Sequence, residues 1–100
     1  MKGERLMDNF STTFNMDFQI AEAFGYEAIQ DTFNRAFAEW KNDYKYLTDL
    51  VMVLNHRCWN WHKKNEKYCE LYSDLYYQAR DYALDNLEGE ELQYYFKITD

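Results

Sequence analysis

The chain contains no proline, and its 20% of aromatic residues recur at helical spacing through most of its length. Proline interrupts helices because it has no backbone N–H and its ring clashes with the preceding turn. Side chains three or four positions apart lie on the same face of a helix. We therefore predict an all-α protein in which uninterrupted helices meet along seams of Tyr, Phe and Trp.

The spacing of apolar residues predicts a compact antiparallel bundle of three main helices, at about residues 26–41, 44–64 and 66–87. Shorter helices are expected at about 14–24 and 90–97. The pattern is clearest in the middle segment, where apolar residues alternate at steps of four and three. Short connections favour antiparallel neighbours. The residues expected in the core are Phe33, Phe37, Leu47, Val51, Leu54, Trp61 and Leu75.

Polar residues and glycines mark the expected helix ends. Thr12 or Thr13 could cap the first helix, and Gly25 occupies the place of a left-handed cap at its end. Asn42-Asp43 provides a turn and an N-cap for the helix that follows, and Asn65 interrupts the chain before the next one.

Residues 1–12 are polar and lack periodicity, so we expect a flexible lead-in followed by a single domain at 13–100. The codons for Lys-Gly-Glu at positions 2–4 can contain the purine-rich sequence that binds bacterial ribosomes, at a suitable distance upstream of Met7. Translation could therefore start at Met7 rather than Met1, and the sequence leaves both starts open.

In the first predicted helix, Phe14, Phe18 and Ala21 share a face, and we expect Ile20 and Phe24 beside it.

One hundred residues, of which 47% are hydrophobic, make one domain with a core of its own. The two cysteines, Cys58 and Cys69, form no CxxC motif, which favours free thiols in a reducing compartment over a disulfide scaffold. The longest purely apolar run, 50–54, is far too short to span a bilayer. No signal peptide is evident. We expect a soluble, cytoplasmic protein without membrane contact.

The net charge of −7 is unevenly distributed along the chain. Residues 41–67 carry six basic and three acidic side chains, whereas both flanking parts are acidic. Overall acidity disfavours broad nucleic-acid binding, because phosphates would be repelled. A local basic surface remains compatible with this distribution.

The basic segment 57–67 interleaves cations with aromatic rings, a combination that suits the stacking of single-stranded bases. A more economical use of such a surface is to pair with acidic groups, either on the helix predicted at about 66–87 or on a partner protein. The alternative is a solvated face with Trp61 in the core. The candidate interaction residues are Arg57, Trp59, Lys63, Lys64 and Lys67.

Cys58 and His62 are four residues apart, and Glu66 and Cys69 would extend their face if the helix continued. Thiolate, imidazole and carboxylate groups can ligate zinc, but this spacing matches no established finger pattern. Cys58 also lies on the apolar stripe, where cysteine acts as a small hydrophobe. We therefore favour a core thiol beside a surface histidine and predict no metal.

The C-terminal part carries an acidic helical face, which is more typical of a solubilising surface than of a binding site. Its residues are Asp74, Asp81, Asp85, Glu88, Glu90 and Glu91. Nothing in the sequence places two carboxylates in an apolar pocket, and no catalytic motif is present. We therefore expect no catalytic or cofactor-binding residues.

From residue 12 onward, the following short segments carry a resemblance to other proteins: Thr12-Thr13-Phe14, Asp17-Phe18, Ala28-Ile29, Asp31-Thr32-Phe33-Asn34-Arg35-Ala36-Phe37, Glu39-Trp40-Lys41, Tyr44-Lys45-Tyr46-Leu47-Thr48, Leu50-Val51-Met52-Val53-Leu54-Asn55, Tyr82-Ala83, Asn86-Leu87, Gly89-Glu90-Glu91-Leu92 and Thr99-Asp100. In these segments the chain resembles a group of small uncharacterised proteins that occur on phages and conjugative elements of gut bacteria. The resemblance implies a setting on a mobile element and no activity.

Small size, the absence of catalytic motifs, aromatic excess and segregated charge favour a non-enzymatic accessory protein that acts through protein–protein contact. The resemblance implies that it belongs to a mobile element. The alternative is a nucleic-acid-associated protein that uses the segment 57–67. The sequence identifies neither the partner nor the oligomeric state.

Overall fold

The computed structural model describes the backbone of residues 2–99 and the side chains of residues 13–99. This part of the chain forms five α-helices and no strand, which confirms the all-α prediction. The helices are α1 (Lys2–Phe24), α2 (Tyr26–Trp40), α3 (Tyr44–Trp61), α4 (Glu66–Asn86) and α5 (Glu90–Thr99).

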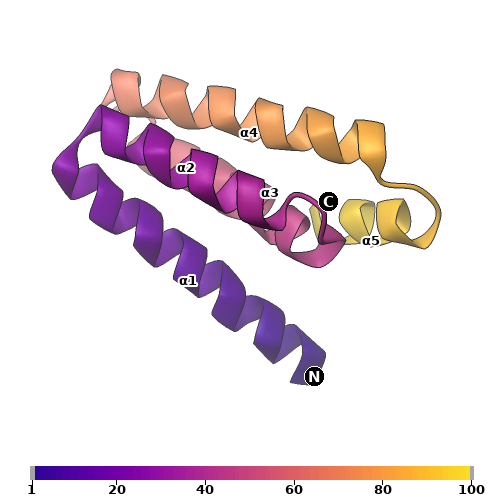
Figure 1. The fold of residues 1–100 in the computed structure, drawn as a ribbon. Helices are drawn as coiled ribbons and strands as arrows, with labels where there is room; N and C mark the ends of the chain where they lie inside the picture. The colour runs from indigo at the N-terminus through magenta and orange to yellow at the C-terminus, as the bar shows by residue number, and fades with distance from the viewer. Residues whose placement is uncertain (1, 100) are drawn as a thin grey trace.

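Helix α3 is the centre of the fold, because it packs against each of the other helices. Figure 1 shows α2 and α4 running alongside one another, while α1 diverges from α2 after a sharp joint and α5 lies near the far end of α4. The joint between α1 and α2 is a single residue, Gly25, with φ 119° and ψ −175°. This conformation is essentially restricted to glycine, and it sets the direction in which α1 leaves the bundle.

Two of the predicted caps are present. The Asp43 carboxylate accepts hydrogen bonds from the backbone N–H groups of Lys45 and Tyr46, at 3.1 and 3.3 Å. The Asn65 side chain accepts from the N–H of Tyr68 at 3.1 Å. Both side chains satisfy N–H groups that the first turn of a helix leaves open, and they fix where α3 and α4 begin.

Two helix ends differ from the prediction. Helix α1 begins at Lys2 instead of near Phe14, so Thr12 and Thr13 lie inside the helix and do not cap it. No proline stops the helix upstream of that point. Helix α3 ends at Trp61 instead of Lys64, because the chain leaves helical geometry at His62 and Lys63 has a φ of 66°.

The predicted core is largely confirmed. Five of its members are buried among the other apolar side chains, namely Phe33, Leu47, Val51, Leu54 and Leu75. Phe37 and Trp61 are only partly buried and pack against the outside of this cluster. The interior is therefore centred on α3 and on the sides of α1, α2 and α4 that face it.

Candidate interaction surfaces

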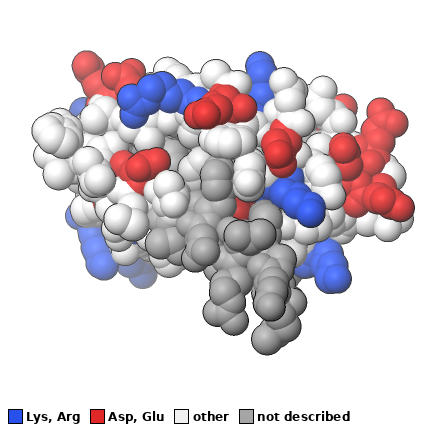
Figure 2. All heavy atoms as spheres, turned by 60° about the horizontal axis from the view of Figure 1, so that its bottom comes forward, with Lys and Arg blue, Asp and Glu red and all other residues white. Residues whose placement is uncertain are grey.

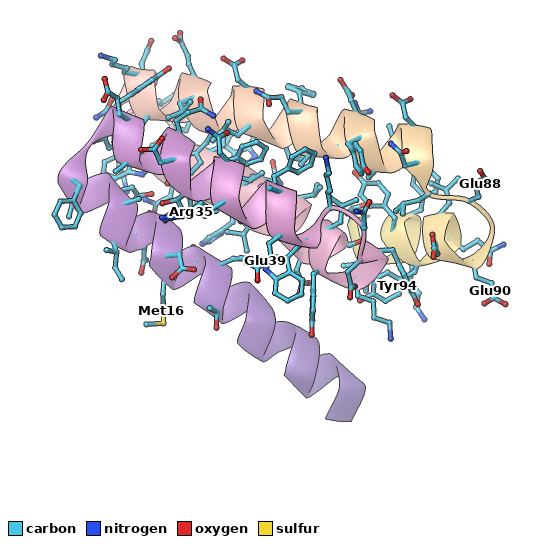
Figure 3. All side chains as sticks on the ribbon, in the orientation of Figure 1. Met16, Arg35, Glu39, Glu88, Glu90 and Tyr94 are labelled. Atoms are coloured by element: carbon cyan, nitrogen blue, oxygen red, sulfur yellow. The ribbon has the colours of Figure 1, made fainter. Side chains whose placement is uncertain are left out.

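Helix α1 carries a row of exposed apolar side chains. Met16, Ile20 and Phe24 follow one another at intervals of four, so they lie on one side of the helix. Their exposed fractions are 53%, 57% and 80%. Figure 3 shows Met16 pointing away from the other helices. We call these three residues the apolar row.

The expectation that Ile20 and Phe24 flank the buried face of α1 was wrong. Phe14, Phe18 and Ala21 are buried as predicted. Ile20, however, follows Phe18 by two positions, which is a rotation of about 200° around the helix and places it on the opposite side. The four-residue spacing of Met16, Ile20 and Phe24 was visible in the sequence, and it is the signal from which the apolar row could have been predicted.

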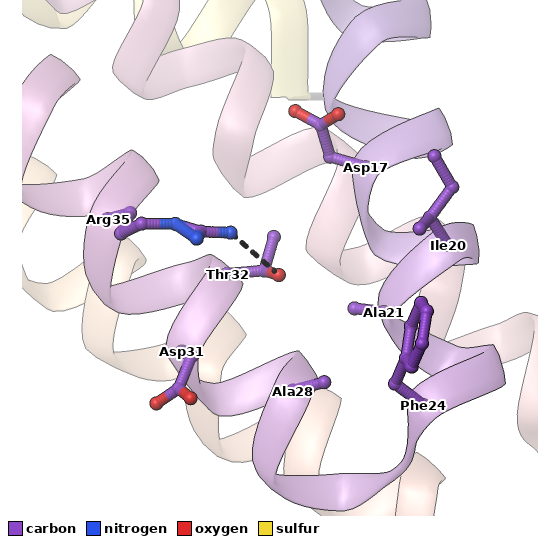
Figure 4. Close-up of a pocket in the computed structure, with 8 residues that line it drawn as sticks. All are labelled: Asp17, Ile20, Ala21, Phe24, Ala28, Asp31, Thr32 and Arg35. Carbon is purple, nitrogen blue, oxygen red and sulfur yellow. Dashed lines mark hydrogen bonds between the residues drawn. The ribbon is translucent and has the colours of Figure 1, made fainter.

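Helices α1 and α2 enclose a groove, and Ile20 and Phe24 of the apolar row line one part of it. One hollow of about 560 Å³ lies near the joint, and a second of about 180 Å³ continues toward Trp40. The two hollows share Asp17, Thr32 and Arg35, so they form a single depression along the two helices. Figure 4 shows the small side chains of Ala21 and Ala28 facing the gap from opposite helices. We call this depression the α1–α2 groove.

The walls of the α1–α2 groove carry more negative than positive charge. Asp17, Asp31 and Glu39 contribute three carboxylates, and Arg35 contributes one guanidinium. Arg35 extends from α2 toward α1, and its Nη2 donates a hydrogen bond of 3.4 Å to the hydroxyl of Thr32. The groove therefore combines apolar contact area with a predominantly acidic wall.

A buried ion pair between Glu22 and Arg57 connects α1 to α3. The Arg57 guanidinium donates to both carboxylate oxygens of Glu22, with Nε–Oε2 at 2.9 Å and Nη2–Oε1 at 2.6 Å. Arg57 is only 3% exposed, so it is no part of an exposed surface, and its inclusion among the interaction residues was wrong. Its buried, two-pronged pairing indicates a role in positioning α1 on the bundle.

Two tyrosines of α4 complete this network. The Tyr72 hydroxyl donates to Glu22 Oε2 at 2.7 Å, and the Tyr68 hydroxyl donates to the backbone oxygen of Glu22 at 3.2 Å. Burial raises the pKa of Tyr72, and the neighbouring Glu22 carboxylate raises it further. The hydroxyl consequently remains a hydrogen-bond donor. Glu22 thus joins α1, α3 and α4, and it was not among the residues predicted from the sequence.

The other predicted interaction residues lie around the connection between α3 and α4. Trp59 is 65% exposed, and Lys63, Lys64 and Lys67 are exposed as well. The rings of Trp59 and His62 meet edge to face with their centroids 5.1 Å apart. We call Trp59, Lys63, Lys64 and Lys67 the basic turn.

Some of the basic groups contact aromatic rings of the protein itself. Lys67 Nζ lies 5.0 Å from the ring centre of Tyr26, at the start of α2. Lys41 Nζ lies 5.7 Å from the ring centre of Phe37 and 5.6 Å from that of Tyr82. These are cation–π contacts within the fold. Interleaving of cations and rings in the sequence therefore reflects internal packing in part.

The residues weighed as zinc ligands do not assemble into a ligand set. The Sγ atom of Cys58 lies 3.6 Å from that of Cys69, while His62 contacts Trp59 and Glu66 is exposed. Within the described residues, no group of three or more His, Cys, Asp or Glu side chains could hold a metal ion. The close approach of the two cysteines was not anticipated.

The predicted acidic face is exposed, as expected for a solvated surface, at Asp74, Asp81, Asp85, Glu88, Glu90 and Glu91. In Figure 2 acidic groups gather at the right-hand end, where Figure 3 labels Glu88 and Glu90, and elsewhere on this face the two signs are interspersed. Among the described residues, no helix is both long and apolar enough to cross a membrane.

Compared with known proteins, the chain matches no family model, no curated protein and no solved structure. The geometry of the surfaces is therefore the basis on which function can be proposed.

Proposed function

We propose that the protein is a non-enzymatic binding protein, and that the α1–α2 groove with the adjacent apolar row receives a segment of another protein. The observation that carries the proposal is the apolar row. Its three large side chains are each more than half exposed, and two of them, Ile20 and Phe24, line the groove. Contiguous exposed apolar surface beside a concave site is typical of protein interaction sites.

The charges around the groove favour a basic partner segment. Asp17, Asp31 and Glu39 outnumber Arg35 on the walls, so an approaching segment with lysines or arginines beside an apolar face would be attracted electrostatically. A groove between two helices is a common receptor for an amphipathic helix. The proposed occupant is therefore an amphipathic helix of a different protein, apolar on one side and basic at its edges.

The setting on a phage or conjugative element, which the family resemblance implies, is part of the proposal.

Substitution of the apolar row tests this function. Tagged wild-type protein is expressed in the native host, and the proteins that copurify with it are compared with those of an Ile20→Ser, Phe24→Ser double variant. Both positions are exposed, so the fold should persist with a change in stability within about 0.5 kcal/mol for each. We expect loss of the specific partner. Tyr77→Ser on the exposed side of α4 is the matched control and should retain it.

A partner that the double variant retains would contradict binding in the groove. A partner that is a second copy of the same chain would contradict the proposed basic helix. Capture that weakens equally in the Tyr77→Ser control would show that the substitutions act through something other than this surface.

The exposed indole of Trp59 beside Lys63 and Lys64 favours a second candidate function, the binding of single-stranded nucleic acid by the basic turn. Its test is the fluorescence anisotropy of a labelled oligonucleotide at several salt concentrations. Binding through phosphates should weaken steeply with salt and disappear in a Lys63→Glu, Lys64→Glu variant. The absence of binding at low salt would reject this function.

A further inference from the structure

The two cysteines of the chain meet across the interface between α3 and α4. Cys58 lies near the end of α3 and Cys69 in the first turns of α4, and their Sγ atoms are 3.6 Å apart. In a disulfide the two sulfur atoms are about 2.05 Å apart, so bond formation needs an approach of roughly 1.5 Å. The two sulfur atoms are therefore in contact but not bonded.

Both cysteine residues are only partly buried. The Cys58 thiol also approaches the backbone oxygen of Cys69 at 3.4 Å, and this contact holds its sulfur close to the partner helix. The pair is thus in contact, not fully buried, and carried by two different helices.

The ten residues between the cysteines, 59–68, form the end of α3, the connection and the start of α4. This loop contains the basic turn, and Lys63 in it has a φ of 66°. A covalent bond between Cys58 and Cys69 would therefore close a short ring around the basic turn and leave the α1–α2 groove untouched.

We propose that Cys58 and Cys69 form a dithiol site that low-molecular-weight disulfides oxidise reversibly to an intramolecular disulfide, which fixes the basic turn against the α3–α4 interface. The inference is independent of the proposed partner groove, because it depends only on the two thiols and the loop that they enclose.

The reaction is thiol–disulfide exchange. The thiolate of one cysteine attacks a sulfur atom of the small disulfide, forming a mixed disulfide and releasing one small thiolate. The second cysteine then loses its proton and attacks the protein sulfur of the mixed disulfide, releasing the other small thiolate. Two protein thiols are oxidised, one small disulfide is reduced to two thiols, and the two protons end on the released thiols.

Burial raises the pKa of Cys58 to about 11, and the neighbouring Cys69 contributes to the increase. A small thiolate fraction slows exchange near neutral pH. The reaction is therefore followed over hours at about pH 8.5, where more thiolate is present.

The test uses the full chain, reduced and then incubated with glutathione disulfide. Remaining thiols are alkylated, and the intact mass is measured together with that of the proteolytic peptides. We expect a loss of two hydrogen masses, no attached glutathione, and a peptide pair linked through Cys58 and Cys69. The melting temperature should rise by about 10 °C, since a loop of this size is restricted in the unfolded chain, and reductant should reverse the rise.

The single variants Cys58→Ser and Cys69→Ser serve as controls. Each should stop at a glutathione adduct on its remaining cysteine and show no comparable rise in melting temperature. Wild-type protein that accumulates two glutathione adducts, forms covalent dimers or retains both thiols would overturn the proposal. A variant that fails to fold leaves the wild-type mass and the reversal by reductant as the deciding readouts.

Discussion

Removal of Arg57 should destabilise the fold strongly, because it would leave the Glu22 carboxylate buried without its cation. The guanidinium binds both carboxylate oxygens, at 2.9 and 2.6 Å, and both side chains are almost fully buried. Breaking a buried pair by truncating one member costs about 3–5 kcal/mol. We expect a loss of this size for Arg57→Met, which keeps much of the side-chain volume and removes the charge.

A double-mutant cycle separates the ion pair from simple packing. Glu22→Gln alone should also destabilise the protein, since it leaves the Arg57 cation buried without a counter-charge. In the double variant no buried charge remains, and the amide oxygen of the introduced glutamine can still accept from the Tyr72 hydroxyl, which now donates to Glu22 at 2.7 Å. The double variant should therefore lose less stability than the two single variants together, by at least about 2 kcal/mol.

Urea unfolding followed by circular dichroism measures these differences, with the midpoint and slope compared across the four proteins. Typical domains have only about 5–15 kcal/mol of stability, so the single variants should show clearly lower midpoints. Two results would refute the reasoning: an Arg57→Met protein within about 1 kcal/mol of wild type, or a double variant whose loss equals the sum of the single losses.

Three further predictions concern the core, the tyrosines and the joint. Leu54→Ala should lower the free energy of unfolding in urea by about 2–5 kcal/mol, because Leu54 is fully buried. Met52→Ala, at an exposed position of the same helix, should lower it by less than about 1 kcal/mol. Equal losses would mean that the buried stripe is misassigned. Burial raises the pKa of Tyr95 to about 12, whereas a tyrosine in the unfolded chain has a pKa near 10. The buried neutral hydroxyl therefore contributes its full stabilisation of the fold below about pH 10, and this stabilisation is lost as the pH rises toward 12. The free energy of unfolding, measured by urea unfolding at each pH, should fall over that range by about 2 kcal/mol more in wild type than in Tyr95→Phe. Identical pH profiles would contradict this. Gly25→Ala should lower the free energy of unfolding by about 1–3 kcal/mol, as judged by thermal unfolding. The cause is the φ of 119°, which strains any residue with a Cβ, since no atom lies close enough to obstruct the added Cβ itself. An unchanged melting temperature would show that the joint does not require glycine.

Local features of the fold were predictable because their causes are local. Asp43 and Asn65 cap the helices that follow them, and a capping side chain needs only the next few residues to act. The alternation of Leu47, Val51 and Leu54 likewise predicts a buried stripe from helical periodicity alone, and these residues are buried.

The pairing of Arg57 with Glu22 was not predictable in this way. The two residues are 35 positions apart and lie on different helices. The sequence of a helix does not show which of its charged side chains points into the protein. Arg57 was grouped with the lysines because it lies near them in sequence. Whether an arginine is exposed or buried depends on the neighbouring helices, and here α1 places a carboxylate directly against it.

The α1–α2 groove depends on how two helices diverge at Gly25. A glycine at this point predicts a helix end, but the angle between the helices follows from packing on α3 and from the Glu22 network. The contact between Cys58 and Cys69 similarly depends on the register of α4 against α3, which sequence spacing alone does not define.

Site-specific photo-crosslinking from the apolar row tests the proposed function most directly. A photoreactive amino acid is introduced in place of Ile20, and separately in place of Tyr77 as the control, since both positions are exposed on different helices. After irradiation in the native host, crosslinked peptides are identified by mass spectrometry. We predict a single heterologous partner from the Ile20 position, joined through a segment that is apolar on one helical face and basic at its edges, and no such partner from the Tyr77 position. Crosslinking of the same partner with equal yield from both positions, or of no protein from the Ile20 position, would contradict binding in the α1–α2 groove.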